Sequence, residues 1–342
     1  MLNKQDNGKN SVIRSENKKS FKTIFLQYWL LMILVLLIIV FSILQPSFMS
    51  LKNIFNLIGQ GSMISLLALG LTGVVVVFEF DLSFADNAAL AAVLSIALVG
   101  KYGMNIFLAW FICLLVSIFI SLINEVFIVR VGVPAFIQTL GMKTILIGIA
   151  NWITGGSVFI FAGLPILFSS LGRSLIFNVI PSTIIPFLIG AVAIVFFLEY
   201  TYMGRYFYAV GSSVEASRRV GIDIKKVKLI AYFIMGICAG IAGIVLGSMF
   251  GIGDPNMGHA YLFPAIISTF LGGVFLRGGE PNPLGTIVAA MILAVIQNGL
   301  ILLGTSLFIK EMIQGGLLVV ILVVITRMQG RIAGVKVSQT LT

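Results

Sequence analysis

The sequence predicts an all-α, polytopic membrane protein, a helical bundle with about ten transmembrane helices and both termini in the cytoplasm. Of its residues, 59% are hydrophobic and only 10% are charged, which lies outside the usual composition of soluble globular domains. The mean hydropathy is +1.12. Apolar runs near the ~20 residues that a helix needs to cross the hydrocarbon core recur along the chain, with short polar breaks between them.

The chain begins with a basic tail, residues 1–23. Its cations are Lys4, Lys9, Arg14, Lys18, Lys19 and Lys22. The apolar run that follows continues to Gln45 and Pro46, whereas a cleavable secretory signal has a shorter apolar core and a small-residue cleavage site. We therefore expect a cytoplasmic tail followed by an uncleaved membrane helix.

The membrane-spanning domain is expected over residues 24–326, followed by a cytoplasmic C-terminal tail, 327–342. The expected spans are 24–44, 57–78, 84–100, 104–129, 133–153, 175–199, 229–251, 259–276, 284–303 and 309–326. An acidic break separates the second span from the short third one. Residues 154–174 contain several glycines and an apolar run too short to span, so we expect a loop with a piece that lies on the surface.

The distribution of Lys and Arg predicts the orientation. Most of these residues fall in the N-terminal tail, in 204–228 and in the C-terminal tail. The positive-inside rule places these segments in the cytoplasm, so the chain is expected in the cytoplasmic (inner) membrane. The net charge of +10 then reflects topology and attraction to anionic lipid. No basic surface interleaved with aromatic residues indicates nucleic-acid binding.

No pattern in the sequence predicts catalysis, a metal or a cofactor. The single histidine, His259, stands at the expected outer start of a span, without a cluster of metal-ligating residues. Neither a GxSxG motif nor a P-loop occurs. Cys113 and Cys238 lie in apolar runs without a CxxC partner, which favours packing roles. The chain is not expected to be an enzyme, so transport would need a coupled ion or a separate ATPase.

The stretch VGSSVEASRRVGIDIKK, residues 210–226, predicts a short helix on the cytoplasmic side. Ser212 and Glu215 have the S-x-x-E spacing of a capping box. Gly221 can adopt the left-handed conformation that ends a helix, and Asp223 can cap the next one. A short rigid helix at the membrane surface is suited to docking a partner protein. A plain polar loop is the alternative.

This stretch resembles the coupling loop in permease subunits of bacterial ribose/simple-sugar-type ABC importers. That family also includes autoinducer and branched-chain amino-acid permeases. Its pattern G-x-x-x-x-A-x-R-x-x-G-I is matched by Gly211, Ala216, Arg218, Gly221 and Ile222. Further stretches resemble the family in the same order: FDLS (80–83), GVPAFIQTLGMKTI (132–145) with TGG (154–156), LGGVFLRGG (271–279), PLGTIVAA (283–290) and IQNGLILLG (296–304).

The resemblance implies a non-catalytic permease subunit that moves a sugar or sugar-like solute. Its implied partners are an ABC ATPase, as a homodimer or a fused tandem protein, a second permease chain, identical or a paralogue, and an extracytoplasmic sugar-binding protein. The coupling loop at 204–228 would insert into a groove of the ATPase. The residues carried over for that contact are Glu215, Ala216, Ser217, Arg218, Gly221 and Ile222, with Gly211 in the same loop.

Several polar residues lie inside the expected spans. A carboxylate at the bilayer centre costs about 2.5–3.5 kcal/mol on insertion scales, so it normally faces a partner or a cavity. We expect a helix break near Asp81 and Ser83, with one of them accepting backbone amides; direct contact with solute is the alternative. The candidates for the translocation path are Asp81, Ser83, Asn124, Gln138 and Asn298. Amides in membrane helices more often bond neighbouring helices.

Glu125 and Lys143 lie in adjacent spans, and we expect them to form a buried ion pair. Two other functions stay open. An ion-coupled secondary transporter could use Glu79, Asp81 and Lys143 as coupling sites and would need no ATPase. A permease for branched-chain amino acids would share the ABC mechanism but would be expected to have a more cationic path.

Overall fold

The computed structural model describes residues 21–161, 163–177, 179–274 and 280–332. In chain order the helices are α1 (Phe21–Leu44), η1 (Pro46–Met49), α2 (Leu51–Val76), α3 (Phe84–Ile96), η2 (Ala97–Lys101), α4 (Ile106–Glu125), η3 (Val126–Val131), α5 (Ala135–Thr154), α6 (Ile166–Arg173), α7 (Ile184–Tyr200), α8 (Tyr202–Ser212), α9 (Val214–Arg219), α10 (Ile224–Phe250), α11 (His259–Val274), α12 (Pro283–Leu302) and α13 (Leu307–Ile332). The all-α class is confirmed.

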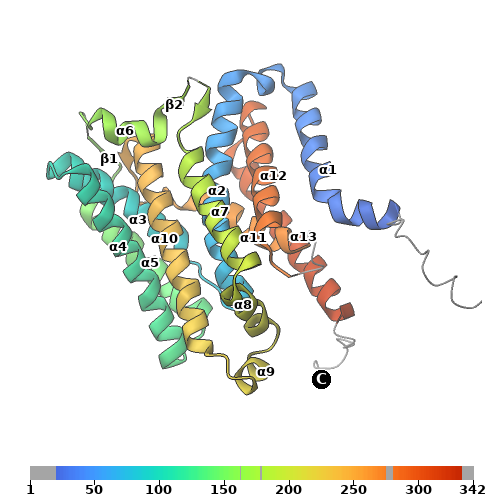
Figure 1. The fold of residues 1–342 in the computed structure, drawn as a ribbon. Helices are drawn as coiled ribbons and strands as arrows, with labels where there is room; N and C mark the ends of the chain where they lie inside the picture. Colours follow the sequence, from blue (N-terminus) through green and yellow to red (C-terminus); the bar gives the residue numbers. More distant parts are fainter. Residues whose placement is uncertain (1–20, 162, 178, 275–279, 333–342) are drawn as a thin grey trace, which may run out of the picture.

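Short strands tie the loops at one end of the bundle. Strand β1 (Phe159–Ile160) pairs antiparallel with β4 (Ile252–Gly253). Strand β2 (Leu175–Ile176) pairs antiparallel with β3 (Ile180–Pro181). Helix α6, the surface-lying piece expected between two spans, lies at the same end (Figure 1). We call this end the α6 end, and the opposite end, which carries α8 and α9, the α9 end.

Six of the described helices are long and apolar enough to cross a membrane. They are α2, α3 with η2, α4 with η3, α5, α10 and α12. Helices α7 and α8 would add a seventh as one span bent by 71°. The described apolar part of α1, Trp29–Leu44, is shorter. The membrane bundle is thus confirmed, whereas the count of about ten spans and the side of both termini stay predictions.

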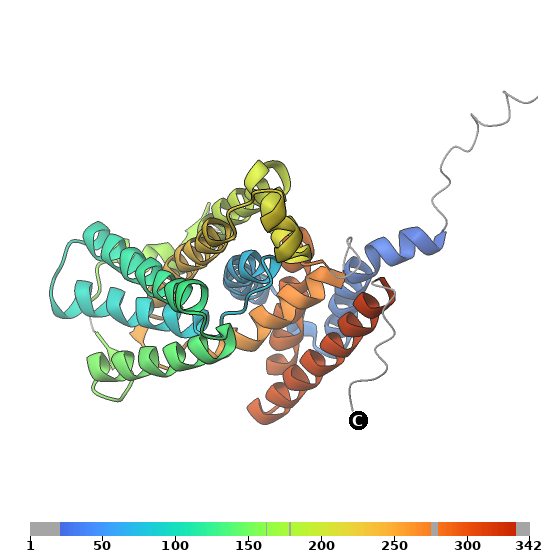
Figure 2. The same cartoon turned by 90° about the horizontal axis from the view of Figure 1, so that it is seen from below.

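Helix α2 is the central element of the bundle. It contacts α7, α10, α11 and α12, and Figure 2 shows it end-on, enclosed by other helices. Its side chains from Gly61 to Val74 are buried all round, as expected for a helix that is apolar on every face. Helices α4 and α5 lie at the periphery and expose much of their surface.

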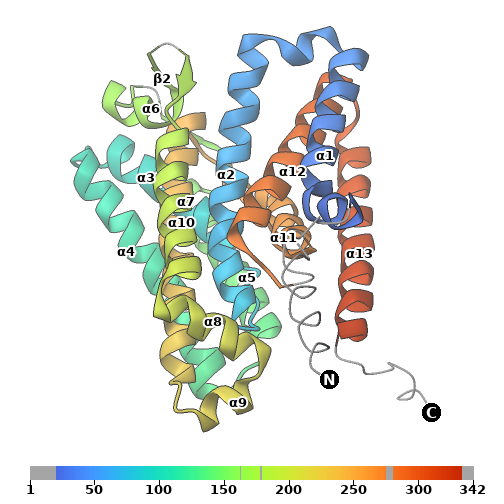
Figure 3. The same cartoon turned by 45° about the vertical axis from the view of Figure 1, so that its right-hand side comes forward.

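Helix α11 begins inside the bundle. After α10 ends at the α6 end, Gly253 lies against Val93 of α3. Five residues later, Gly258 lies against Ala85 near the start of α3, where a Cβ would stand 2.3 Å from the Ala85 carbonyl oxygen. The chain therefore returns along about eight residues of α3, or roughly 12 Å, before α11 starts. Figure 3 places α11 at about half the height of the bundle. The prediction that His259 stands at the outer start of a span is wrong.

Candidate functional site

The coupling segment folds into α8, α9 and the start of α10. Ser213 Oγ accepts the Ala216 amide at 3.2 Å and so forms the N-cap of α9. The predicted cap, Ser212, is wrong, because α8 runs through this residue and its Oγ donates to the Tyr208 carbonyl at 2.9 Å. Glu215 then stands one position too early for a capping box.

The C-terminal end of α9 forms as predicted. Gly221 has φ +82°. The Ile222 amide donates to the Ser217 carbonyl at 3.0 Å and the Gly221 amide to the Arg218 carbonyl at 3.1 Å, which is the Schellman pattern. Asp223 Oδ1 accepts the Lys226 amide at 3.1 Å and caps α10. Helix α9 is therefore fixed at both ends.

The faces of α9 differ. Glu215, Ala216 and Arg218 are exposed, as is Gly221. Val214 and Ile222 are half-buried and pack against the main core. Ser217 is buried at 3% exposure, so the expectation that its side chain enters a partner's groove is wrong: it faces the bundle. Val220, which was not predicted as part of this surface, is 76% exposed beside it.

Contacts tie the coupling segment to the loop between α2 and α3. Gly211 lies on α8, where a Cβ would stand 1.9 Å from the Val76 carbonyl oxygen, so this glycine allows close packing. Lys228 Nζ forms an ion pair with Glu79 Oε1. Tyr232 Oη donates to the Phe80 carbonyl at 3.2 Å. These pairings could not be predicted from the sequence, because the partners are distant in the chain.

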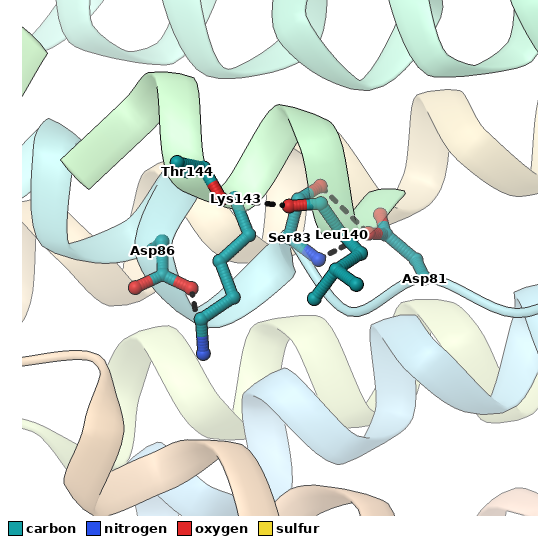
Figure 4. A network of polar contacts seen from close by, with 6 residues as sticks. All are labelled: Asp81, Ser83, Asp86, Leu140, Lys143 and Thr144. Carbon is teal, nitrogen blue, oxygen red and sulfur yellow. Dashed lines mark hydrogen bonds and ion pairs between the residues drawn. The ribbon is translucent and has the colours of Figure 1, made fainter. Parts of the chain in front are cut away.

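Four of the five path candidates form one hydrogen-bonded chain. Asp81 Oδ1 accepts both the amide and the hydroxyl of Ser83, each at 2.7 Å (Figure 4). Asn124 Nδ2 donates to Ser83 Oγ at 2.8 Å, and Gln138 Nε2 donates to Asn124 Oδ1 at 3.4 Å. The expected helix break with Asp81 as acceptor is confirmed. This chain, hereafter the Asp81 chain, joins the α2–α3 loop to α4 and α5.

Asn298 does not join the Asp81 chain. It lies on α12 and exchanges hydrogen bonds with Asn53 of α2. Asn53 Nδ2 donates to Asn298 Oδ1 at 2.8 Å, and Asn298 Nδ2 donates to Asn53 Oδ1 at 2.9 Å. Both residues are buried. This reciprocal pair links two helices, as buried amides in membrane bundles commonly do.

The predicted ion pair of Glu125 with Lys143 is wrong. Lys143 Nζ instead lies 3.6 Å from Asp86 Oδ2 (Figure 4). The reason is that α5 packs against α3, which brings Lys143 to the first turn of α3. Glu125 is 1% exposed, and its Oε2 accepts no hydrogen bond among the described residues. Within the described part of the chain, no group of three or more His, Cys, Asp or Glu could hold a metal.

The bundle of apolar helices, with buried polar contacts between them, defines a multi-pass membrane protein. A family model described as "Branched-chain amino acid transport system / permease component" matches residues 53–322. The chain belongs to this family of permeases and is a multi-pass protein of the inner membrane.

Curated relatives are similar over most of their length. The ribose import permease protein of Escherichia coli K12 is 32% identical over 85% of this chain and 92% of its own. That of Bacillus subtilis 168 is 31% identical over 82% of this chain and 87% of its own. The autoinducer 2 import system permease protein of Yersinia pseudotuberculosis is 28% identical over 82% of this chain and 79% of its own. No solved structure matches significantly.

Proposed function

We propose that the chain is the membrane-spanning permease subunit of an ABC importer for a sugar or sugar-like solute, driven by ATP hydrolysis in a separate subunit. The observation that carries this proposal is α9, a short helix capped at both ends that exposes Glu215, Ala216 and Arg218 at one end of the bundle. A rigid surface helix suits the transfer of motion from a docked ATPase. The names of the ribose and autoinducer 2 relatives support a sugar-like solute.

The α9 end faces the cytoplasm in this proposal. Cations gather in the coupling segment there: Arg205, Arg218, Arg219, Lys225, Lys226 and Lys228. The positive-inside rule favours that side for such a cluster. The chain then crosses the membrane about ten times within residues 24–326. Both tails, 1–23 and 327–342, lie in the cytoplasm.

The proposed partners are an ABC ATPase, as a homodimer or fused tandem protein, a second permease chain, identical or a paralogue, and an extracytoplasmic sugar-binding protein. The ATPase contacts Glu215, Ala216, Arg218 and the turn at Gly221. Ile222 and Ser217 hold α9 on the bundle, and Gly211 holds α8 on α2. The Asp81 chain fixes the helices beside the translocation path, so that movement of the α2–α3 loop reaches α4 and α5.

The test is uptake into proteoliposomes that hold the chain with its ATPase, using labelled D-ribose and the sugar-binding protein as probe. We expect uptake that requires ATP and survives collapse of all ion gradients by ionophores. An ion-coupled secondary transporter would give the reverse result. The ion pair of Glu79 with Lys228 and that of Lys143 with Asp86 do not favour free coupling sites at these positions. Uptake without ATP would overturn the proposal.

A further inference from the structure

We propose that Asp86 and Lys143 form a solute-contacting site half-way across the membrane, and that it takes an uncharged polyhydroxylated solute. This inference rests on the proposed function and deepens it by naming the residues that meet the solute. The two residues come from different helices, α3 and α5, and face one another (Figure 4). Neither belongs to the Asp81 chain.

Most hydrogen-bonding groups of the earlier candidates are directed at the protein itself; the exception is Asp81 Oδ2, which accepts no hydrogen bond among the described residues. Ser83 and Asn124 bond to each other, and Ser83 also bonds to Asp81. Asn298 is occupied by Asn53. A solute would have to break these buried contacts, each a cost of about 1–3 kcal/mol for the group left unsatisfied. These residues therefore serve the fold.

Asp86 differs from them. It is 2% exposed, yet neither carboxylate oxygen accepts a hydrogen bond among the described residues. Lys143 Nζ stands 3.6 Å away, beyond the 2.7–3.2 Å range of N–H···O bonds. The Lys143 side chain keeps 19% of its surface exposed. A buried ion pair is stable only when further hydrogen bonds satisfy its lone pairs and protons, so this pair has unused capacity for a polar ligand.

The pair lies near the bilayer centre. Lys143 follows the start of α5 by eight residues and precedes its end by eleven, which places it roughly 12 Å and 16 Å from the two ends. The start of α11 reaches the same level, because a Cβ at Gly258 would stand 3.1 Å from the Asp86 amide nitrogen. The pair and this helix start therefore meet at one depth.

The backbone before α11 is non-helical at that depth. Asn256 and His259 are exposed there. Irregular backbone inside a membrane is tolerated only where it is buried in protein or lines a water-filled cavity. Helices that begin near the mid-plane are typical of solute sites in transporters. The exposed polar side chains beside Asp86 and Lys143 therefore favour a water-filled cavity at this depth.

The chemistry of the pair selects the solute. A carboxylate accepts hydrogen bonds from two hydroxyl groups, and an ammonium donates to ring or hydroxyl oxygens. The carboxylate and the ammonium neutralise each other, so an ionised solute could pair with one of them only by displacing the other. A neutral solute with several hydroxyls can hydrogen-bond to both groups at once. Bonds to charged groups are also stronger than neutral ones.

The first test measures water access and needs neither ATPase nor sugar. In full-length chain with Cys113→Ala and Cys238→Ala, Lys143→Cys is combined with Asp86→Asn so that no unpaired carboxylate remains. In membrane vesicles we expect it to react at least about tenfold faster with 2-sulfonatoethyl methanethiosulfonate than Ile145→Cys. The nucleophile is the thiolate, which needs water to ionise; it attacks the reagent's sulfenyl sulfur, forms a mixed disulfide and releases methanesulfinate. Ile145, on the same helix, is 56% exposed and faces lipid in this account. Equal rates would overturn the proposal.

The second test separates solute contact from packing. Replacing a buried ion pair by apolar residues is often neutral for folding, so Asp86→Leu with Lys143→Met should insert and co-purify with the ATPase. We expect its D-ribose uptake to fall by about tenfold or more, with the ATPase still bound. Uptake at the wild-type rate would mean that the pair is structural. If the wild-type chain binds no ATPase, the proposed importer function is refuted. The thiol-reactivity measurement would still show whether water reaches the site of Asp86 and Lys143.

Discussion

Lys228 Nζ and Glu79 Oε1 form an ion pair that joins the start of α10 to the loop between α2 and α3. Both side chains are mostly buried, at 16% and 12% exposure. Only the turn 220–223 separates α9 from α10, so a displacement of α9 would be passed through Lys228 to Glu79. Two residues further on, Asp81 starts the chain of hydrogen bonds that reaches α4 and α5. The pair is therefore the first link from the exposed helix to the buried helices.

Breaking this ion pair should uncouple hydrolysis from transport. A hydrogen bond to a charged group contributes about 1.5–3 kcal/mol, so Glu79→Gln should leave the complex assembled but lower the solute imported per ATP hydrolysed. The measurement is that ratio in proteoliposomes. The exchange Glu79→Lys with Lys228→Glu should recover part of it. An unchanged ratio in Glu79→Gln would remove the pair from the coupling route.

Packing of α8 on α2 should depend on Gly211. A Cβ at this position would stand 1.9 Å from the Val76 carbonyl oxygen, so Gly211→Ala should destabilise the chain by about 1–3 kcal/mol. Thermal unfolding in detergent measures the effect. Gly148→Ala is the matched control, because its Cβ would meet nothing within 4 Å. Equal unfolding temperatures for both variants would contradict the close contact.

The two adjacent serines before α9 should differ. Ser213→Ala removes the N-cap and should cost about 1 kcal/mol of helix stability, which weakens retention of the ATPase. Ser212→Ala removes only a bond within α8 and should have a smaller effect. Quantifying the ATPase retained on the tagged chain distinguishes them. A larger effect of Ser212→Ala would restore the original capping-box prediction.

Asn53 and Asn298 should act as a structural unit. Asn298→Leu leaves the buried Asn53 Oδ1 without its partner and should cost about 1–3 kcal/mol, although Asn53 Nδ2 keeps its bond to the Phe48 carbonyl. Adding Asn53→Leu removes that unpaired oxygen but also the bond to the Phe48 carbonyl, so the double variant should recover part of the stability and transport D-ribose with an unchanged KM. Unfolding and uptake curves check both points. If KM stays raised in the double variant while stability returns, Asn298 contacts the solute.

The C-terminal end of α9 could be predicted because its signals are local. Gly221 supplies the left-handed conformation, and Asp223 caps the helix that follows. The N-terminal end could not, because α8 depends on tertiary packing. Its Phe207 and Val210 are fully buried in the main core. Their three-residue spacing was the available signal for a helix, but the surrounding polar residues favoured a loop.

The partner of Lys143 could not be read from the sequence. Glu125 and Asp86 both lie on helices next to α5. Which one meets Lys143 depends on how α3 and α4 are rotated about their axes, and that rotation follows from packing of the whole bundle. The start of α11 near the middle of the membrane also depends on packing of the whole bundle, so it could not be predicted either. Its apolar run resembles a complete span, although the chain before it descends along α3.

Helix α9 is the proposed docking site of the ATPase. Its most direct test is co-purification of the tagged chain from mild detergent, with ATP hydrolysis measured in each eluate. The variant carries Ala216→Glu and Arg218→Gln, both exposed positions of α9, and the control carries Lys101→Glu, exposed at the α6 end. We predict that wild type and control retain an ATP-hydrolysing partner while the inserted α9 variant loses it. Full retention by the α9 variant would show that the ATPase docks elsewhere.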